Sequence, residues 1–186
     1  MAVKRLRLDR ARYKLPREVV YMAGRQGELP LDLEIFLCFA IYSASHAFNR
    51  IYQPLLEGLG LTYPQYIAMV LLWERDGQTV GDLGQRLFLE SNTVTPLLKR
   101  LETLGHVKRR RDPADERQVR IYLTEAGRKL RQRAVNIPRC ILDASGLDGM
   151  QAKRLLEEIR ALRKALESHH SISKDPKHRS SVDRVR

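Results

Sequence analysis

The sequence predicts a mainly α-helical fold with a small β-wing, of the winged helix-turn-helix class. Apolar residues recur at steps of three and four along several segments, as they do on one face of a helix. One such segment ends at Gly105 and is followed by two short strand-like runs joined by a charged turn, the pattern of a hairpin. Residues 99–133 carry twelve basic and five acidic side chains, within a net charge of +12 for the chain. A basic helix and hairpin favour a nucleic-acid-binding function.

The N-terminal segment, residues 1–30, mixes Arg and Lys with isolated apolar residues, and we expect a basic arm without stable structure. Met22 offers an alternative start of translation. The arm lacks the apolar segment of a secretory signal. The longest apolar runs, residues 35–41 and 67–73, fall short of the roughly 20 residues that span a bilayer. We therefore expect a cytoplasmic protein that does not associate with membranes.

Two helices are predicted before the basic region. A continuous apolar stripe along residues 33–56 predicts a long helix that is too apolar to stand alone. Gly58 follows the end of this helix. Thr62 or Tyr63 is expected to cap a second helix over residues 66–74.

The next pair of segments predicts the helix-turn-helix. Thr79 has the position of an N-cap, with Asp82 three residues later in a capping box, so a short helix is expected over residues 79–87. A second helix begins at Ser91. Pro96 lies about one turn inside it and removes a backbone donor, so we expect an irregular start.

The second helix has two chemically different faces. One is apolar and suits a core, whereas the other carries Asn, Thr, Lys and Arg side chains. Asn and Thr can hydrogen-bond base edges or phosphates, and Lys and Arg can pair with phosphates or guanine. The polar face is therefore predicted to contact DNA.

The C-terminal third is expected to be helical. Thr124 is placed to cap a helix that continues to about residue 135, Pro138 is expected to interrupt the chain, and residues 147–166 form a final amphipathic helix. The apolar face of this last helix suits a helical partner. The polar tail, residues 168–186, is expected to lack stable structure.

Two cysteines, Cys38 and Cys140, lie 102 residues apart without clustered histidines, which disfavours a zinc site; we expect no metal and no cofactor. A structural disulfide is not expected in a cytoplasmic protein. A lone cysteine on an apolar helix is more often a small buried hydrophobe than a reactive group. By itself, the pattern favours a packing role for Cys38.

Six segments within about residues 31–167 share their order and spacing with a known family. They are Leu37-Cys38-Phe39-Ala40-Ile41-Tyr42, Tyr52-Gln53-Pro54-Leu55-Leu56, Leu61-Thr62-Tyr63-Pro64-Gln65-Tyr66, Leu71-Leu72-Trp73-Glu74, Thr93-Val94-Thr95-Pro96-Leu97-Leu98-Lys99-Arg100-Leu101-Glu102 and Asp112-Pro113-Ala114-Asp115-Glu116-Arg117. On these segments the chain resembles MarR-family repressors, specifically the organic-hydroperoxide-sensing OhrR type. The resemblance implies a homodimer joined by its terminal helices.

The resemblance also implies a domain plan. A MarR-type domain would span residues 31–167, with a DNA-binding lobe at 61–123 and dimerisation helices at 31–57 and 124–167. The dimer would place two recognition helices in successive major grooves of double-stranded DNA, so the operator should be an inverted repeat. Arg117, braced by Asp115, is expected in the minor groove. The expected DNA-binding residues are Ser91, Asn92, Thr93, Thr95, Lys99, Arg100, Arg109, Arg111 and Arg117.

For the cysteines, the resemblance reverses the packing interpretation. It implies that Cys38 is the thiol that organic hydroperoxides oxidise to a sulfenate. Tyr42, Tyr52 and Tyr63 match positions around this thiol. Tyr42 is four residues on and shares a helix face with Cys38, whereas Tyr52 lies about 21 Å along the helix and would reach the thiol only from the other subunit.

Cys140 approximately matches the resolving cysteine of two-cysteine relatives, which forms an intersubunit disulfide with the oxidised thiol. Single-cysteine relatives instead form mixed disulfides with small thiols, so both possibilities stay open for Cys140.

The expected function is therefore a non-enzymatic repressor that releases its operator when Cys38 is oxidised. One alternative is a MarR-type repressor released by a phenolic or lipid-like ligand, with Cys38 inert. Another is a thiol peroxidase, which is disfavoured because the sequence has no Cys-x-x-Cys motif, no alternation of strands with helices and no paired acid and base residues.

Overall fold

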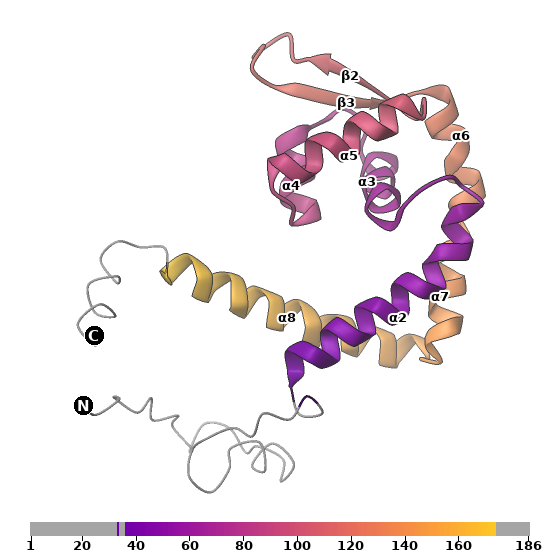
Figure 1. The fold of residues 1–186 in the computed structure, drawn as a ribbon, viewed down its shortest axis with the longest axis vertical. Coiled ribbons are helices and arrows are strands. Elements are labelled where there is room, and N and C mark those ends of the chain that lie inside the picture. The colour runs from indigo at the N-terminus through magenta and orange to yellow at the C-terminus, as the bar shows by residue number, and fades with distance from the viewer. Residues whose placement is uncertain (1–32, 34–35, 174–186) are drawn as a thin grey trace, which may run out of the picture. The chain divides into compact units, whose positions relative to one another are not determined.

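The computed structural model describes Leu33 and residues 36–173. Figure 1 shows the order of the elements along the chain. They are α2 (Leu37–Glu57), α3 (Tyr63–Glu74), β1 (Gln78–Thr79), α4 (Val80–Leu87), α5 (Ser91–Thr103), β2 (Val107–Arg111), β3 (Val119–Leu123), α6 (Glu125–Ala134), α7 (Ile137–Ser145) and α8 (Gly149–Ser173). The chain divides into two compact units between Phe48 and Asn49, within α2. The expected basic arm, residues 1–30, lies outside the described residues.

Helices α4 and α5 form the predicted helix-turn-helix. The capping box at the start of α4 is confirmed: the Asp82 backbone N–H donates to Thr79 Oγ1 at 3.0 Å, and the Thr79 N–H donates to Asp82 Oδ2 at 3.2 Å. The turn between the helices places Phe88 in the left-handed region, with φ 56°. The Leu89 N–H then bonds the Gly84 carbonyl at 3.0 Å, which closes the turn.

The expected helix is confirmed, and Pro96, where an irregular start was expected, does not break it: α5 runs from Ser91 to Thr103. Pro96 cannot donate the helical bond to the Asn92 carbonyl. The same helix buries Val94, Leu98 and Leu101 completely. Burial of an apolar side chain contributes about 1.5–3 kcal/mol, so this packing outweighs one missing hydrogen bond.

The wing is an antiparallel sheet of three strands in the order β1-β3-β2. Strands β2 and β3 pair from Val107 opposite Leu123 to Arg111 opposite Val119. The two-residue strand β1 was not expected from the sequence; it pairs Gln78 with Ile121 and joins the helices to the hairpin.

We call residues 63–123, from α3 to β3, the winged lobe. Its core is made by apolar side chains from α3, α4, α5 and both wing strands. The largest of the fully buried ones are Met69, Leu72, Leu83, Val94, Leu98, Leu101, Val107 and Ile121. This core holds α5 and the wing together. Figure 1 shows α5 lying beside the strands of the wing.

Helix α6 begins as expected, with Thr124 Oγ1 accepting the Gly127 N–H at 3.0 Å. The expected interruption occurs just before Pro138, at residues 135–136, but a separate helix that was not expected, α7, then runs from Ile137 to Ser145. Pro138 lies in its first turn, where the missing backbone donor has no helical partner in any case. Pro138 therefore starts a helix, and Cys140 lies on it.

Helix boundaries differ at both ends of the domain. The first long helix is α2, Leu37–Glu57, and α3 begins at Tyr63 rather than at residue 66. Helix α8 continues to Ser173, so residues 168–173 of the expected tail are helical. No Gly or Pro occurs in the sequence between Gly149 and residue 176, and polarity alone does not end a helix. Residues 174–186 lie outside the described residues.

Helices α2 and α8 carry many exposed apolar side chains in the single chain. Among these are Leu37, Phe39, Ile41, Tyr42, Phe48, Ile51, Met150, Leu155, Leu156, Ile159 and Leu166. Of the described residues of α2, only Leu56 is buried. Within the described part of the chain, no helix has the length and apolar character needed to cross a membrane.

Candidate DNA-binding face and thiol sites

The exposed face of α5 carries the expected polar residues. Ser91, Asn92, Thr93, Lys99 and Arg100 are all exposed, whereas Thr95 is half-buried. The Thr93 hydroxyl donates to Asn92 Oδ1 at 3.2 Å, so two of these side chains are already ordered together. The opposite face of the helix packs into the core, which leaves the polar face available for DNA.

The wing is held in shape by two carboxylates. Asp112 accepts the Ala114 backbone N–H at 2.9 Å and the Arg120 Nε–H at 2.6 Å, and both bonds lower the pKa of Asp112, the amide contributing most. Asp115 accepts the backbone N–H of Arg117 and the side-chain amide of Gln118, which lower the pKa of Asp115 in that order. Both carboxylates are therefore charged at neutral pH.

Arg117 lies at the exposed end of the wing, and its side chain is 93% exposed. Arg117 Nε donates to Asp115 Oδ1 at 3.2 Å, which is the brace expected from the sequence. The guanidinium of Arg117 is thus held through its Nε–H, while its Nη groups stay open to a partner.

The other wing arginines have different surroundings. Arg111 is exposed at the end of β2. The guanidinium carbon of Arg110 lies 6.0 Å from the centre of the Tyr122 ring. Arg109 is the most covered, with 24% of its side chain exposed, and its backbone N–H donates to Glu102 Oε1 at 2.9 Å.

An open pocket of about 360 Å³ brings parts of this face together. It is lined by Thr79, Val80, Gly81, Ser91, Thr95, Arg109, Arg117, Gln118 and Val119. Four of these residues, Ser91, Thr95, Arg109 and Arg117, were expected to bind DNA. Thr79, Gly81 and Gln118 were not, because small or uncharged residues outside the recognition helix give no signal in sequence.

The two cysteines are both free thiols, and both are exposed. Cys38 lies in the second position of α2, within the first unit, and Cys140 lies on α7, within the second. The exposure of Cys38 contradicts the packing interpretation for the single chain. Tyr42 lies on the same helix, with its ring 4.4 Å from that of His46 between centroids.

Tyr52 and Tyr63 come together in the second unit, with ring centroids 4.6 Å apart. The ring of Tyr66 joins them, with its centroid 6.0 Å from that of Tyr52. From the sequence, Tyr66 was expected only as a residue of the second helix. Burial, with smaller contributions from Tyr63 and Tyr66, raises the pKa of Tyr52 to about 12. Burial also raises the pKa of Tyr63. Both phenols are therefore neutral hydrogen-bond donors at physiological pH.

These tyrosines line an open pocket of about 460 Å³. Its lining residues are Asn49, Tyr52, Gln53, Leu56, Glu57, Leu61, Thr62, Tyr63 and Pro64. Among the described residues there is no cluster of three or more His, Cys, Asp or Glu side chains that could hold a metal.

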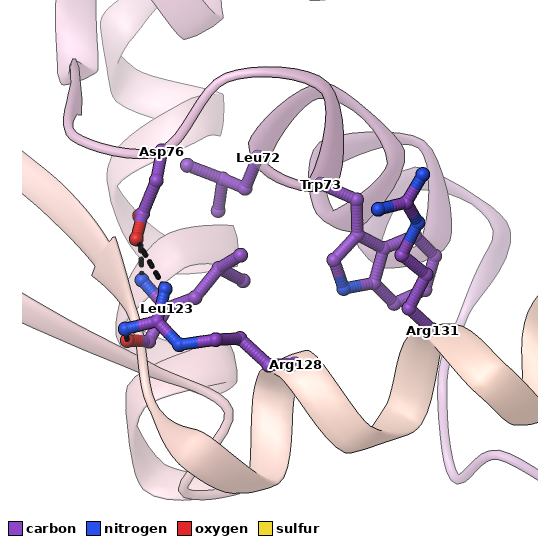
Figure 2. Close-up of a pocket in the computed structure, with 6 residues that line it drawn as sticks. All are labelled: Leu72, Trp73, Asp76, Leu123, Arg128 and Arg131. Atoms are coloured by element: carbon purple, nitrogen blue, oxygen red, sulfur yellow. Dashed lines mark hydrogen bonds and ion pairs between the residues drawn. The ribbon is translucent and has the colours of Figure 1, made fainter.

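A polar junction joins α3 to the start of α6 (Figure 2). Asp76 Oδ2 accepts Arg128 Nη1 at 2.7 Å, and Asp76 Oδ1 accepts the Leu123 backbone N–H at 2.8 Å. Trp73 Nε1 donates to the Gly127 carbonyl at 2.8 Å. Two of these bonds fasten α6, the helix that leaves the wing, and the third fastens the end of β3.

A helix-turn-helix, a hairpin wing and a basic face that joins them define a DNA-binding protein of the winged-helix class. The family described as the transcriptional regulator SarA/Rot matches residues 50–134.

Two curated relatives extend this match. The HTH-type transcriptional regulator TtmR of Methylorubrum extorquens (strain PA1) is 42% identical over 160 residues, 86% of this chain and 81% of that protein. The organic hydroperoxide resistance transcriptional regulator of Bacillus subtilis (strain 168) is 44% identical over 136 residues, 73% of this chain and 92% of that protein.

Solved structures show the same fold. Reduced AbfR bound to DNA, from the Staphylococcus epidermidis regulator, has a TM-score of 0.60 and 39% identity, over 70% of this chain and 90% of that one. Overoxidised AbfR bound to DNA has a TM-score of 0.60 and 37% identity, over 82% of this chain and 99% of that one. Disulfide-formed AbfR has a TM-score of 0.50 and 40% identity, over 74% and 90%.

The chain belongs to the MarR family of transcriptional regulators and, within it, to the OhrR type. The resemblance seen in the sequence and the winged helix-turn-helix fold are both confirmed.

Proposed function

We propose that the protein is a homodimeric repressor that binds an inverted-repeat operator in double-stranded DNA while Cys38 is reduced. An organic hydroperoxide oxidises this thiol, and the dimer then releases the operator. The observation that carries the proposal is the 44% identity with an organic hydroperoxide resistance transcriptional regulator, in a chain whose Cys38 is a free thiol on α2. A free thiol can react with a peroxide, whereas a cysteine in a disulfide cannot.

The apolar surface of the terminal helices supports the proposed dimer. Side chains such as Leu37, Ile41, Leu155 and Ile159 remain exposed in the single chain. A second copy would cover them, and each buried side chain of this kind contributes about 1.5–3 kcal/mol. We assign the dimerisation helices to residues 31–57 and 124–167 and the DNA-binding lobe to residues 61–123.

The DNA contacts divide by element. Ser91, Asn92, Thr93 and Thr95, with Lys99 and Arg100 further along α5, enter a major groove or contact the phosphates at its edge. The wing places Arg117 in the adjoining minor groove. In the dimer two such lobes bind the two halves of an inverted repeat.

The chemical step is a two-electron oxidation of sulfur. The Cys38 thiolate attacks the O–O bond of the hydroperoxide, so that an S–O bond forms, the O–O bond breaks and the alkoxide leaves as an alcohol after taking a proton. Tyr42 from the same helix face, and the neutral Tyr52 and Tyr63 of the partner subunit, donate hydrogen bonds to the charged sulfur and oxygen. Nothing but the hydroperoxide supplies the oxidising equivalents.

Cys140 of the partner subunit resolves the sulfenic acid. Its thiolate attacks the Cys38 sulfur, an S–S bond forms, the S–O bond breaks, and the hydroxide leaves as water after taking a proton. AbfR, a protein of the same fold, is known in a disulfide-formed state, and its overoxidised form is bound to DNA. In that protein, oxidation beyond the thiol does not by itself prevent DNA binding. We therefore assign operator release here to the disulfide.

Release requires only a modest change in free energy. Every 1.4 kcal/mol by which the disulfide form binds DNA less well lowers the affinity about tenfold. A difference of about 3 kcal/mol is thus enough to empty most operators in a cell that holds the regulator near its dissociation constant. We place the protein in the cytoplasm. The genes that it represses are those needed during oxidative stress.

The test combines oxidation with DNA binding in the same samples. Reduced protein is titrated with cumene hydroperoxide, then analysed by non-reducing electrophoresis, intact mass and binding to DNA from upstream of its own gene. We expect a linked dimer at one oxidant per subunit, coincident with release. Cys38→Ser should bind DNA and ignore the peroxide, and Cys140→Ser should lose the linked dimer.

Other outcomes identify other mechanisms. Release with an adduct on Cys38 alone would remove the resolving role of Cys140. Release of Cys38→Ser by the peroxide would contradict the thiol mechanism while leaving DNA binding intact. Continuous consumption of peroxide with a thiol reductant would instead identify a thiol peroxidase.

The second candidate function is a repressor released by a non-covalent phenolic or lipid-like ligand. The pocket of about 460 Å³ beside Tyr52 and Tyr63 favours it, because two phenols and apolar side chains suit such a molecule. A ligand that releases DNA equally from the wild type and from Cys38→Ser would support this candidate.

A further inference from the structure

We propose that the pocket of about 360 Å³ between α4, α5 and the wing binds one phosphate of the DNA backbone and so couples the recognition helix to the wing. This inference rests on the proposed DNA-binding function and adds a defined contact to it. The residues that carry it are Thr79, Gly81, Ser91, Arg109 and Gln118.

Arg109 has binding capacity that the protein does not use. Its Nε–H is buried and has no hydrogen-bond partner among the described residues. Its Nη1 lies 4.0 Å from Glu102 Oε2, too far for a good hydrogen bond. The Nε–H is covered by protein atoms, so the donors that a phosphate oxygen in the pocket can reach are the Nη groups of this guanidinium, whose side chain is 24% exposed.

The pocket also offers uncharged donors. Thr79 Oγ1 already accepts the Asp82 N–H, which leaves its own O–H to donate to a ligand. Ser91 is the first residue of α5, and the N-cap residue Glu90 makes no side-chain cap bond. The Thr93 N–H donates to the Glu90 carbonyl, so the N–H groups of Ser91 and Asn92 are the ones left to an anion, which the helix dipole also favours.

The charge of the pocket selects an anion. Arg109 and Arg117 are both part of its lining, and no carboxylate is among the described lining residues. Asp82 lies near the start of α4, but one of its oxygens is committed to the Thr79 N–H. Gln118 Nε2 donates one hydrogen to Asp115 Oδ2 and retains a second for a ligand.

The position of the pocket identifies the source of the phosphate. It lies between α5, which enters the major groove, and the wing, which reaches the minor groove. The sugar-phosphate strand is what separates the two grooves of a duplex, so a lobe that reads both must cross that strand here. A phosphate bound at this point would fix the distance between the recognition helix and Arg117.

The experiment compares two neighbouring arginines of β2. Arg109→Gln removes the charge from the pocket, whereas Arg110→Gln removes an equal charge from an arginine outside its lining, beside Tyr122. Operator affinity is measured over a range of salt. We expect Arg109→Gln to weaken binding about tenfold and to lower the slope of log affinity against log salt by about 0.9 more than Arg110→Gln does.

A second arm of the experiment changes the DNA instead of the protein. Single phosphates of the operator are replaced by neutral methylphosphonates, one position at a time. One position between the two grooves should weaken wild-type binding and should lose this effect in Arg109→Gln. Equal salt slopes for the two variants, or a methylphosphonate profile that Arg109→Gln leaves unchanged, would overturn the proposal without touching DNA binding itself.

A free anion is the remaining alternative. If inorganic phosphate, at constant ionic strength, raises the melting temperature of the wild type but not of Arg109→Gln, while the methylphosphonate profiles are the same, the pocket takes a small anion and the DNA proposal fails. If the wild type binds no DNA at all, the proposed function fails first.

Discussion

Asp115 and Arg117 form a closed pair at the exposed end of the wing. One carboxylate oxygen, Asp115 Oδ1, accepts both the backbone N–H of Arg117 at 3.1 Å and its Nε–H at 3.2 Å. The Arg117 side chain nevertheless stays 93% exposed. The pair therefore orients the arginine before DNA arrives, which reduces the conformational entropy lost on binding.

Replacing this arginine should weaken specific binding. Arg117→Ala is expected to cost about 1–3 kcal/mol of operator affinity, and Asp115→Ala should cost less because it removes the orientation and not the charge. Fluorescence anisotropy with a labelled operator measures both, and circular dichroism checks the fold. An Arg117→Ala protein with unchanged affinity would remove Arg117 from the DNA-binding face.

Acid should destabilise the wing through its carboxylates. Hydrogen bonds from the Ala114 N–H and Arg120 hold the pKa of Asp112 below its ordinary value. A lowered pKa in the folded state gives stability that is complete above about pH 4 and is lost as the pH falls further. Urea denaturation across this range should show a smaller acid loss for Asp112→Asn than for the wild type. Asp143→Asn, at an exposed carboxylate 4.0 Å from Arg139, is the matched control.

At alkaline pH, Tyr52 should make the stability depend on pH in the opposite direction, because its pKa is raised in the folded state rather than lowered. Its pKa is raised to about 12 by burial, so the folded state keeps the proton that the unfolded state loses at about pH 10. The stability it supports is complete below about pH 10 and is lost as the pH rises to about 12. The chain has seven tyrosines, so the difference between the ultraviolet titrations of wild type and Tyr52→Phe is the measurement. A difference centred near pH 10 would contradict the buried environment.

A glycine on α6 sets the approach of this helix to the loop before the wing. A Cβ atom added at Gly127 would lie 2.0 Å from the His106 carbonyl oxygen. Gly127→Ala should lower the free energy of unfolding by at least about 1–3 kcal/mol, through overpacking against backbone. Gly149→Ala at the start of α8, where nothing lies within 4 Å, should have little effect or stabilise slightly. Equal melting temperatures for the two variants would contradict the close approach.

Much of the winged lobe was predictable because its signals are local. The capping pairs of Thr79 with Asp82 and of Thr124 with Gly127 mark helix starts within four residues, and the structure has both. The recognition helix and the hairpin follow from periodicity. These features depend on neighbours in sequence, so one chain is enough to find them.

What could not be predicted depends on contacts distant in sequence. Strand β1 exists only because Gln78 pairs with Ile121. Helix α7 was not predicted, because a proline can end one helix or begin another, and only the path of the chain decides. Of the candidate site, Tyr52 and Tyr63 were named from the resemblance, whereas the pocket that adds Thr79 and Gln118 to Arg109 needed three-dimensional structure.

Trp73 gives the junction between α3 and α6 an optical signal of its own. It is the only tryptophan of the chain, its indole N–H donates to the Gly127 carbonyl at 2.8 Å, and its ring lies 6.3 Å from that of Tyr66. The wavelength of indole emission depends on its hydrogen bond and on access of water. Unlabelled protein can thus report, in real time, whether oxidation of Cys38 loosens the helix that leaves the wing.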